Sequence, residues 1–401
     1  MQLIVDLGPQ PPSNRFLRSA DEATPLHPLR VMQCEGCGLV QLADPMPVDM
    51  VRSRFEWLTY NEPEGHLDRL VDRLADWMTG QAGERPSDLP DVLGVTYKDD
   101  STLARLARRG LGHTRRLDPA TDLEVHDPLA SLETFQRALT PARARALAER
   151  QGAADVVVAR HILEHAHDPA AFLEACCELA RPGGLIVFEV PDSSTFLEAC
   201  DYSFLWEEHV CYFTPATLQY FLAARGLHVG ETLVFPYSLE NSINAILVNS
   251  RGMAVDHAAD PAEIARGRRF AQGFDRRRAG YRRRIEALKA SVGRVAVFGA
   301  GHLATKFINF NGVADLLEGV VDDSPNKRHL FMPGSRLPIV GSSLLADPSL
   351  GVCLMSLSPE SEQKVVAAQK PFVARGGQLL SMFACSPRSL ECDARRAGEA
   401  G

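Results

Sequence analysis

The sequence lacks a membrane-length apolar run, a secretory signal and an excess of basic charge. No apolar run in its 401 residues approaches the roughly 18 that a membrane-spanning helix needs, and the N-terminal MQLIVDLGPQPPSNRF has no basic segment before an apolar one. The formal net charge of −8 gives no general attraction to nucleic acid or anionic membranes. The nine cysteines mostly lie singly, which argues against a disulfide framework. We therefore expect a cytoplasmic protein without nucleic-acid or membrane partners.

Strands and helices alternate through most of the chain. Apolar runs at 154–159 (ADVVVA) and 185–192 (LIVFEVPD) predict buried strands, and RPGG before the second run predicts a turn. Between the two runs, Asp168 and Pro169 have the form of an N-cap and first residue of a helix. VGRVAVFGAGHLATKFINF starts a second strand–turn–helix series. The alternation predicts an α/β fold with doubly wound parallel sheets, in which ligands lie at the carboxyl ends of the strands.

Changes in composition divide the chain into three parts. Residues 1–55 are rich in proline, residues 56–255 hold the first α/β series, and residues 256–401 begin with a basic helix and hold the second. The basic helix, residues 261–290, contains ten Arg and Lys. Such a run could contact phosphates, but we favour a solvated face on a helix that links two domains.

Two short motifs contain side chains that bind metals in other proteins. Cys34 and Cys37 form a CxxC that could supply half of a tetrahedral zinc site, and two ordinary cysteines in a turn are an equal alternative. His161-Ile-Leu-Glu164-His165 matches the HxxEH pattern of inverted zinc peptidases, which requires a helix. Here the pattern follows directly on a predicted strand, so we interpret it as a loop that faces a ligand cleft.

A glycine-rich turn opens the second α/β series. Gly299-Ala-Gly301-His-Leu-Ala304 lies between a predicted strand and a predicted helix, and Asp322 follows 21 residues after Gly301, near where a ribose-binding acid is expected. The turn either binds a nucleotide or supplies the small residues that tight packing requires. Both interpretations remain open.

The segment WEEHVCYFTP, residues 206–215, has the composition of a proton-transfer site. His209 directly follows Glu207 and Glu208, and a carboxylate beside an imidazole tunes it as a general base. Thr214-Pro215 also has the form of a helix N-cap and first helical residue. The two interpretations agree, because a capped helix would fix the loop that presents His209.

Four segments together carry a family resemblance. They are DLGPQPPSNRFL with HPLRVMQCEGCGLVQL, then ARHILEHAHDPAAFLEACCELARPGGLIVFEVPD, then EEHVCYFT, and last FGAGHLATKFINF with VVDDSPNKRHLFMPGSRLPI. In this order they resemble parts of the SAM-dependent C-methyltransferases that act on nucleotide-linked keto-deoxysugars: the zinc-binding domain, the middle of the class I methyltransferase domain, the EHxxYF signature and the C-terminal domain. The resemblance implies a zinc-knuckle-like segment, a class I methyltransferase domain and a second Rossmann-like domain.

The resemblance also implies a reaction. SAM would be bound by the middle domain, and the small-molecule substrate, a nucleotide sugar or related activated metabolite, would lie between the middle and C-terminal domains. His209 would be the base that forms an enolate, which takes the methyl group, and Glu208 would orient it. The implied substrate contacts are His165, Tyr212, Asn241 and Lys306, the implied cofactor contacts are Gly94, Asp99, Asp118 and Glu164, and the implied zinc ligands are Cys34 and Cys37.

Several segments depart from the family pattern. The family's loop of the form EIGSNDGxLL reads LGVTYKDDSTLARL here, with Tyr97 and Lys98 in place of small residues. The family's YHEH reads Trp206-Glu207-Glu208-His209, its HGGSLR reads LENSIN, and Cys34 and Cys37 match only one of its two cysteine pairs. An alternative is therefore an enzyme of the same fold that no longer uses SAM and performs epimerisation or elimination. A methyltransferase acting on oxygen or nitrogen is a further alternative.

Overall fold

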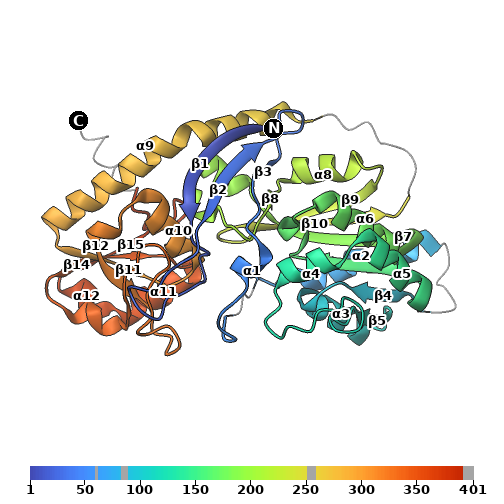
Figure 1. The fold of residues 1–401 in the computed structure, drawn as a ribbon, viewed down its shortest axis with the longest axis horizontal. Coiled ribbons are helices and arrows are strands. Elements are labelled where there is room, and N and C mark those ends of the chain that lie inside the picture. The colour runs from blue at the N-terminus through green and yellow to red at the C-terminus, as the bar shows by residue number, and fades with distance from the viewer. Residues whose placement is uncertain (59–61, 83–88, 251–258, 392–401) are drawn as a thin grey trace.

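The structure, a computed structural model, describes residues 1–58, 62–82, 89–250 and 259–391 (Figure 1). Its N-terminal sheet is antiparallel, in the order β1-β2-β3-β8. The first three strands come from the first 42 residues, whereas the last belongs to the WEEHVCYFTP segment and pairs Tyr212 with Val40. The bounds are β1 Gln2–Gln10, β2 His27–Gln33, β3 Val40–Leu42 and β8 Cys211–Tyr212.

The middle of the chain forms a six-stranded sheet in the order β5-β4-β6-β7-β10-β9. The first four of these strands are parallel, and β10 is antiparallel to both of its neighbours. The central strands are nearly continuous apolar runs, as expected for strands covered on both faces by helices (Figure 1). The bounds are β4 Asp91–Gly94, β5 His113–Arg116, β6 Ala154–Arg160, β7 Ala180–Asp192, β9 His228–Phe235 and β10 Asn241–Val248.

Short loops connect these strands to the helices around them. Asp168 caps α6 through a 3.0 Å bond to the N–H of Ala171, and Thr214 caps α8 in the same way, as the sequence predicts. The helices of this part are α1 Val48–Val51, α2 Leu67–Ala82, α3 Asp100–Arg108, α4 Leu132–Ala138, α5 Pro141–Gln151, α6 Pro169–Leu179, α7 Ser194–Ala199 and α8 Pro215–Ala223. Its 3₁₀ turns are η1 Tyr97–Asp99, η2 Leu163–His165 and η3 Tyr202–Phe204.

The C-terminal part forms a parallel sheet in the order β13-β12-β11-β14-β15. The predicted basic helix is α9, which runs along this sheet and onto the N-terminal one (Figure 1). The strands are β11 Arg294–Phe298, β12 Leu317–Val321, β13 Ile339–Val340, β14 Leu350–Met355 and β15 Gln378–Ser381. The helices and turns are α9 Pro261–Ser291, α10 His302–Asn311, α11 Pro359–Ala368, α12 Lys370–Ala374, η4 Ala314–Leu316 and η5 Ser342–Ala346.

One local expectation needs correction, and one sheet was not predicted. The RPGG segment does not separate a helix from a strand but lies inside β7, where a register shift accommodates it: Ala180 pairs with Ala154, and Leu185 pairs with Val156. The N-terminal residues, in which the sequence predicted no strands, form three of the four strands of a sheet. In the described part of the chain, no helix has the length and apolarity that a membrane crossing requires.

Candidate active site

Two adjoining cavities lie at the carboxyl ends of the strands of the six-stranded sheet. The larger has a volume of about 1110 Å³ and is lined by residues that follow β4 and β5, among them Tyr97, Lys98 and Asp118. The smaller has a volume of about 530 Å³, and its wall includes His302 and Glu360 from the C-terminal part. The larger and smaller cavities share wall residues, namely Glu62, Tyr97, Lys98, Ser131 and Glu208. A ligand in one cavity can therefore contact a ligand in the other.

The turn after β4 is held from behind by Asp99. Its carboxylate is fully buried and accepts hydrogen bonds from the backbone N–H groups of Val95, Thr96 and Arg160, at 2.7 to 2.8 Å. Burial raises the pKa of Asp99 to about 7, although these hydrogen bonds act in the opposite direction. Gly94 is needed here, since a Cβ would lie 2.9 Å from the Cβ of Asp99. Both residues, implied as cofactor contacts, shape the turn without lining the larger cavity.

Asp118 lies on the wall of the larger cavity, directly after the carboxyl end of β5. Its Oδ1 accepts hydrogen bonds from the N–H groups of Ala120 and Thr121, at 3.0 and 2.8 Å. These bonds hold the carboxylate in place and lower its pKa. A fixed, ionised acid at the end of this strand suits the hydroxyls of a ribose.

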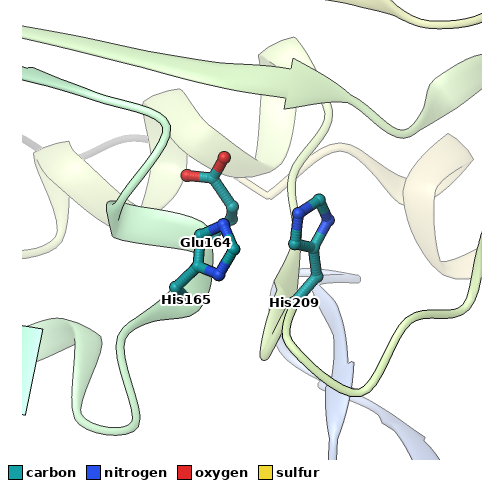
Figure 2. Close-up of side chains that lie close together, drawn as sticks. All are labelled: Glu164, His165 and His209. Atoms are coloured by element: carbon teal, nitrogen blue, oxygen red, sulfur yellow. The ribbon is translucent and has the colours of Figure 1, made fainter. Parts of the chain in front are cut away.

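His165 and His209 face each other across the smaller cavity (Figure 2). Their ring centroids are 4.7 Å apart, and ligand atoms of both rings and of the Glu164 carboxylate lie within 4.8 Å of one another. A 2.7 Å hydrogen bond from the N–H of Val210 to the carbonyl of Glu164 ties the two loops together. The HxxEH segment is therefore a 3₁₀ turn on a cavity wall, as interpreted from the sequence, and not a helix.

Three of the four histidines on this wall, His209, His165 and His161, differ in their protonation preferences. Burial, with the neighbouring positive charge of His165, lowers the pKa of His209 well below 6.5, so it is neutral. Burial disfavours the charged form of His165 as well, but the Glu133 carboxylate, 2.6 Å from Nδ1, outweighs burial and raises its pKa. Similarly, Glu189 and Glu164 raise the pKa of His161 to about 10 against the effect of burial. A neutral histidine thus faces a charged one.

Glu164 is the carboxylate that accompanies His209. It is 2% exposed, neither of its oxygens has a hydrogen bond among the described residues, and Oε1 lies 3.5 Å from Nδ1 of His161. Glu208, implied as the orienting acid, instead groups with Glu133 and His165. Burial, with the negative charges of Glu133 and Glu207, raises its pKa well above 4.5. Glu164 was implied as a cofactor contact, yet it lines only the smaller cavity.

The other implied substrate contacts differ in position. Asn241 lines the smaller cavity and donates a 3.2 Å hydrogen bond to Asp192. Tyr212 does not line it; its hydroxyl accepts a 2.9 Å hydrogen bond from the N–H of Trp206 and anchors the loop. Lys306 is 1% exposed and forms an ion pair with Glu207 away from the cavity.

Sequence reasoning missed several residues of the smaller cavity. Trp206 stacks on His302, with ring centroids 4.5 Å apart and planes at 18°. Glu133 pairs with His165, and Glu189 pairs with His161 and Arg160. His302 occupies a position after a glycine-rich turn, where a side chain points to the end of the sheet, and this signal could have identified it. Glu133 and Glu189 carry no such signal.

The cysteine pair does not fit a structural zinc. Cys34 and Cys37 lie in a knuckle-like turn closed by a 2.9 Å hydrogen bond from the N–H of Gly38 to the carbonyl of Cys34. Burial raises the pKa of the Cys37 thiol to about 11. Across the described ranges, no group of three potential ligands includes either cysteine, whereas a structural zinc takes four. We therefore derive no role for zinc.

Comparisons with known proteins agree with this architecture. Three family models match in order: a putative zinc binding domain over residues 1–50, a methyltransferase domain over 99–232 and a C-methyltransferase C-terminal domain over 250–383. The C-methyltransferase NovU of Streptomyces niveus is 24% identical over 395 residues, which cover 94% of this chain and 91% of that protein. A ubiquinone biosynthesis O-methyltransferase of Cupriavidus pinatubonensis is 28% identical over 56% of this chain and 86% of that protein.

Among solved structures, this chain is similar to magnesium protoporphyrin IX methyltransferase from Synechocystis PCC 6803 with bound SAM. The identity is 12%, the match covers 48% of this chain and 87% of that one, and the TM-score is 0.29.

The sheet order, the site at its carboxyl end and the matched domains define a class I methyltransferase with a second Rossmann-like domain. Over nearly its whole length the chain is similar to C-methyltransferases that have this three-part organisation.

Proposed function

We propose that this enzyme transfers the methyl group of SAM to a carbon next to a keto group of a nucleotide-linked deoxysugar or a related activated metabolite. The observation that carries the proposal is the neutral His209, which lies in the smaller cavity beside a buried carboxylate and a charged histidine. The similarity to a C-methyltransferase over 94% of the chain supports transfer to carbon.

The larger cavity fits SAM, whose sulfonium supplies an electrophilic methyl group when it is bound. Asp118 would hold the ribose hydroxyls, and Tyr97 and Lys98 would contact the cofactor from the turn after β4. The implied zinc ligands have no part in this scheme, since the two cysteines lie outside both cavities.

In the proposed reaction, His209 removes the proton from the carbon next to the keto group. The Glu164 carboxylate, close to the same ring, stabilises the imidazolium that forms. His165 is kept charged by Glu133 and faces His209, so it can stabilise the negative charge that develops on the enolate oxygen. The enolate carbon would then take the methyl group while the bond between that methyl and the sulfur of SAM breaks, which leaves S-adenosylhomocysteine.

The substrate would occupy the smaller cavity, between the six-stranded sheet and the C-terminal part. Asn241 contributes to this cavity from β10, and Ser358 and Glu360 from the start of α11. Because both parts supply wall residues, neither part alone completes the site. This arrangement supports a substrate with two recognisable portions, as a sugar nucleotide has.

The test uses the variant His209→Gln with a panel of nucleotide-linked keto-deoxysugars. We expect kcat to fall about 10²- to 10⁴-fold, the usual contribution of a general base. The dissociation constant of S-adenosylhomocysteine should stay within about twofold, because His209 lies outside the larger cavity. Turnover that persists undiminished would contradict the assignment of His209 as the base.

A second readout separates methylation from the SAM-free alternative. Wild-type enzyme in heavy water should exchange the proton next to the keto group, as followed by NMR, and should methylate that carbon when SAM is added. Exchange without methylation on any substrate of the panel would instead support epimerisation or elimination.

A further inference from the structure

Lys98 is a buried cation on the wall shared by the two cavities. The residue is 9% exposed, and its Nζ lies 2.7 and 2.6 Å from the two oxygens of Glu62. Glu62 also lines both cavities. An ammonium and a carboxylate removed from water are costly unless each is well paired. Each partner therefore compensates the charge of the other.

Arg160, the neighbouring buried cation, is engaged by the protein itself. Its guanidinium donates hydrogen bonds to the Glu189 carboxylate and to the carbonyl of Lys98, and the side chain is 2% exposed. Lys98 differs, because its carboxylate partner, Glu62, lies in the segment before α2. The side chain of Glu62 is 28% exposed. Of the two cations, Lys98 can change partner with less disruption.

From this position, and on the premise that SAM is the cofactor as proposed above, we infer that Lys98 binds the α-carboxylate of SAM and Glu62 binds its α-ammonium. The two ligand charges flank one carbon atom, and Lys98 and Glu62 supply the complementary charges side by side. When the zwitterion inserts between them, each buried ion exchanges one partner for another and the net charge stays the same. Lys98, which replaces a small residue of the family's loop, is thus a cofactor contact.

Calorimetric titration of the full-length protein with three compounds tests this assignment. S-Adenosylhomocysteine carries both charges, its decarboxylated analogue carries only the ammonium, and methylthioadenosine carries neither. For Lys98→Met we expect S-adenosylhomocysteine to bind about 10- to 100-fold more weakly, the usual loss for a hydrogen bond between charged groups. Binding of the two compounds without the carboxylate should change less than about threefold.

Three further variants complete the experiment. Glu62→Gln should weaken the two compounds that carry the ammonium and leave methylthioadenosine unchanged. Lys98→Arg, which keeps the charge, should recover most of the affinity for S-adenosylhomocysteine. Lys364→Met removes an exposed lysine of α11 and is the matched control, with no expected effect.

Each outcome decides the assignment. An unchanged affinity of Lys98→Met for S-adenosylhomocysteine would leave Lys98 and Glu62 as a structural pair and overturn the inference. Equal weakening of all three compounds would overturn it too, since Lys98 would then shape the adenosine site. If the wild-type protein bound none of the three compounds, the proposed use of SAM would fail first, and the inference would fail with it.

Discussion

At the scale of single residues, the site depends on neighbouring histidines with opposite protonation preferences. His209 is held neutral by burial and by positive neighbours, whereas His161 and His165 are held charged by carboxylates. A sequence cannot reveal this division, because all three residues have the same unperturbed pKa. The division depends on which acids the fold brings to each ring, and Glu133 lies 32 residues from its partner His165.

The neutral state of His209 predicts the pH dependence of methyl transfer. Protonation removes the base, so kcat should fall only as the pH falls through the pKa of His209, which lies well below 6.5. The measurement is kcat against pH from about 4.5 to 8, with exposed His228→Gln as the control that leaves the profile unchanged. An acid limb centred at or above about 6.5 would show that the environment does not lower this pKa.

The charged state of His161 predicts a loss of stability at high pH. Its folded pKa of about 10 lies above the unfolded value of 6.5, so its contribution is complete below 6.5 and disappears as the pH rises through about 10. The loss should be on the order of 3 kcal/mol, as for other broken buried pairs. Urea unfolding of wild type and His161→Gln measures it: the difference between the two should shrink between pH 7 and about 10.5. A constant difference would contradict the prediction.

Chelation tests whether Glu164, His165 and His209 take part in proton transfer or bind a catalytic metal ion. Three ligand atoms within 4.8 Å are also compatible with a divalent cation. Because we assign His209 as the base, we expect that EDTA treatment followed by gel filtration leaves kcat unchanged. Loss of activity that a divalent cation restores would exclude that role for His209. The unfolding temperature should also be unchanged by EDTA, since the cysteine pair does not fit a zinc site.

At the scale of elements, the sequence predicted the strands and helix starts that local residue patterns determine. The apolar runs gave β6 and most of β7, and the Asp168 and Thr214 caps gave the starts of α6 and α8. The N-terminal sheet was missed, because Pro9 and Pro28 lie inside β1 and β2, two register shifts interrupt the β1–β2 pairing, and the fourth strand comes from far along the chain, where Tyr212 pairs with Val40. Contacts between distant segments also explain what was missed in the site. The pair Glu208-His209 was recognised as a motif, but the acid beside His209, Glu164, and the residue stacked on Trp206, His302, come from other elements.

The contact between α9 and the N-terminal sheet predicts opposite effects for two glycines of the same helix. A Cβ at Gly267 would lie 2.1 Å from Nε2 of Gln33, which is buried and donates hydrogen bonds to the carbonyls of Gly38 and Glu263. We expect Gly267→Ala to destabilise the protein by about 1–3 kcal/mol. A Cβ at Gly280 would meet nothing within 4 Å, so Gly280→Ala should stabilise by about 0.5–1 kcal/mol. Urea unfolding measures both, and effects of the same sign would contradict the packing of α9.

At the scale of the whole molecule, one buried ion pair joins all three parts of the chain. Glu207, from the segment that carries His209, pairs with Lys306 of α10 and accepts a 3.0 Å hydrogen bond from the hydroxyl of Ser13. Thr305 donates a 3.1 Å hydrogen bond to the carbonyl of Ser13. The network lies behind the smaller cavity and fixes the loop that presents His209. Because the loop is held from both sides, the geometry of the base depends on how the three parts are assembled.

Removal of one partner from this network should affect both stability and catalysis. Lys306→Met leaves the Glu207 carboxylate buried without its cation, so we expect a loss of about 3–5 kcal/mol in the free energy of unfolding. The double variant Glu207→Gln/Lys306→Met removes both charges and should recover part of that loss, whereas exposed Lys364→Met should have no effect. Where Lys306→Met is still folded, kcat should fall while the affinity for S-adenosylhomocysteine is retained, because Lys306 lies outside the larger cavity. A fully active and stable Lys306→Met protein would show that the three parts are held together without this pair.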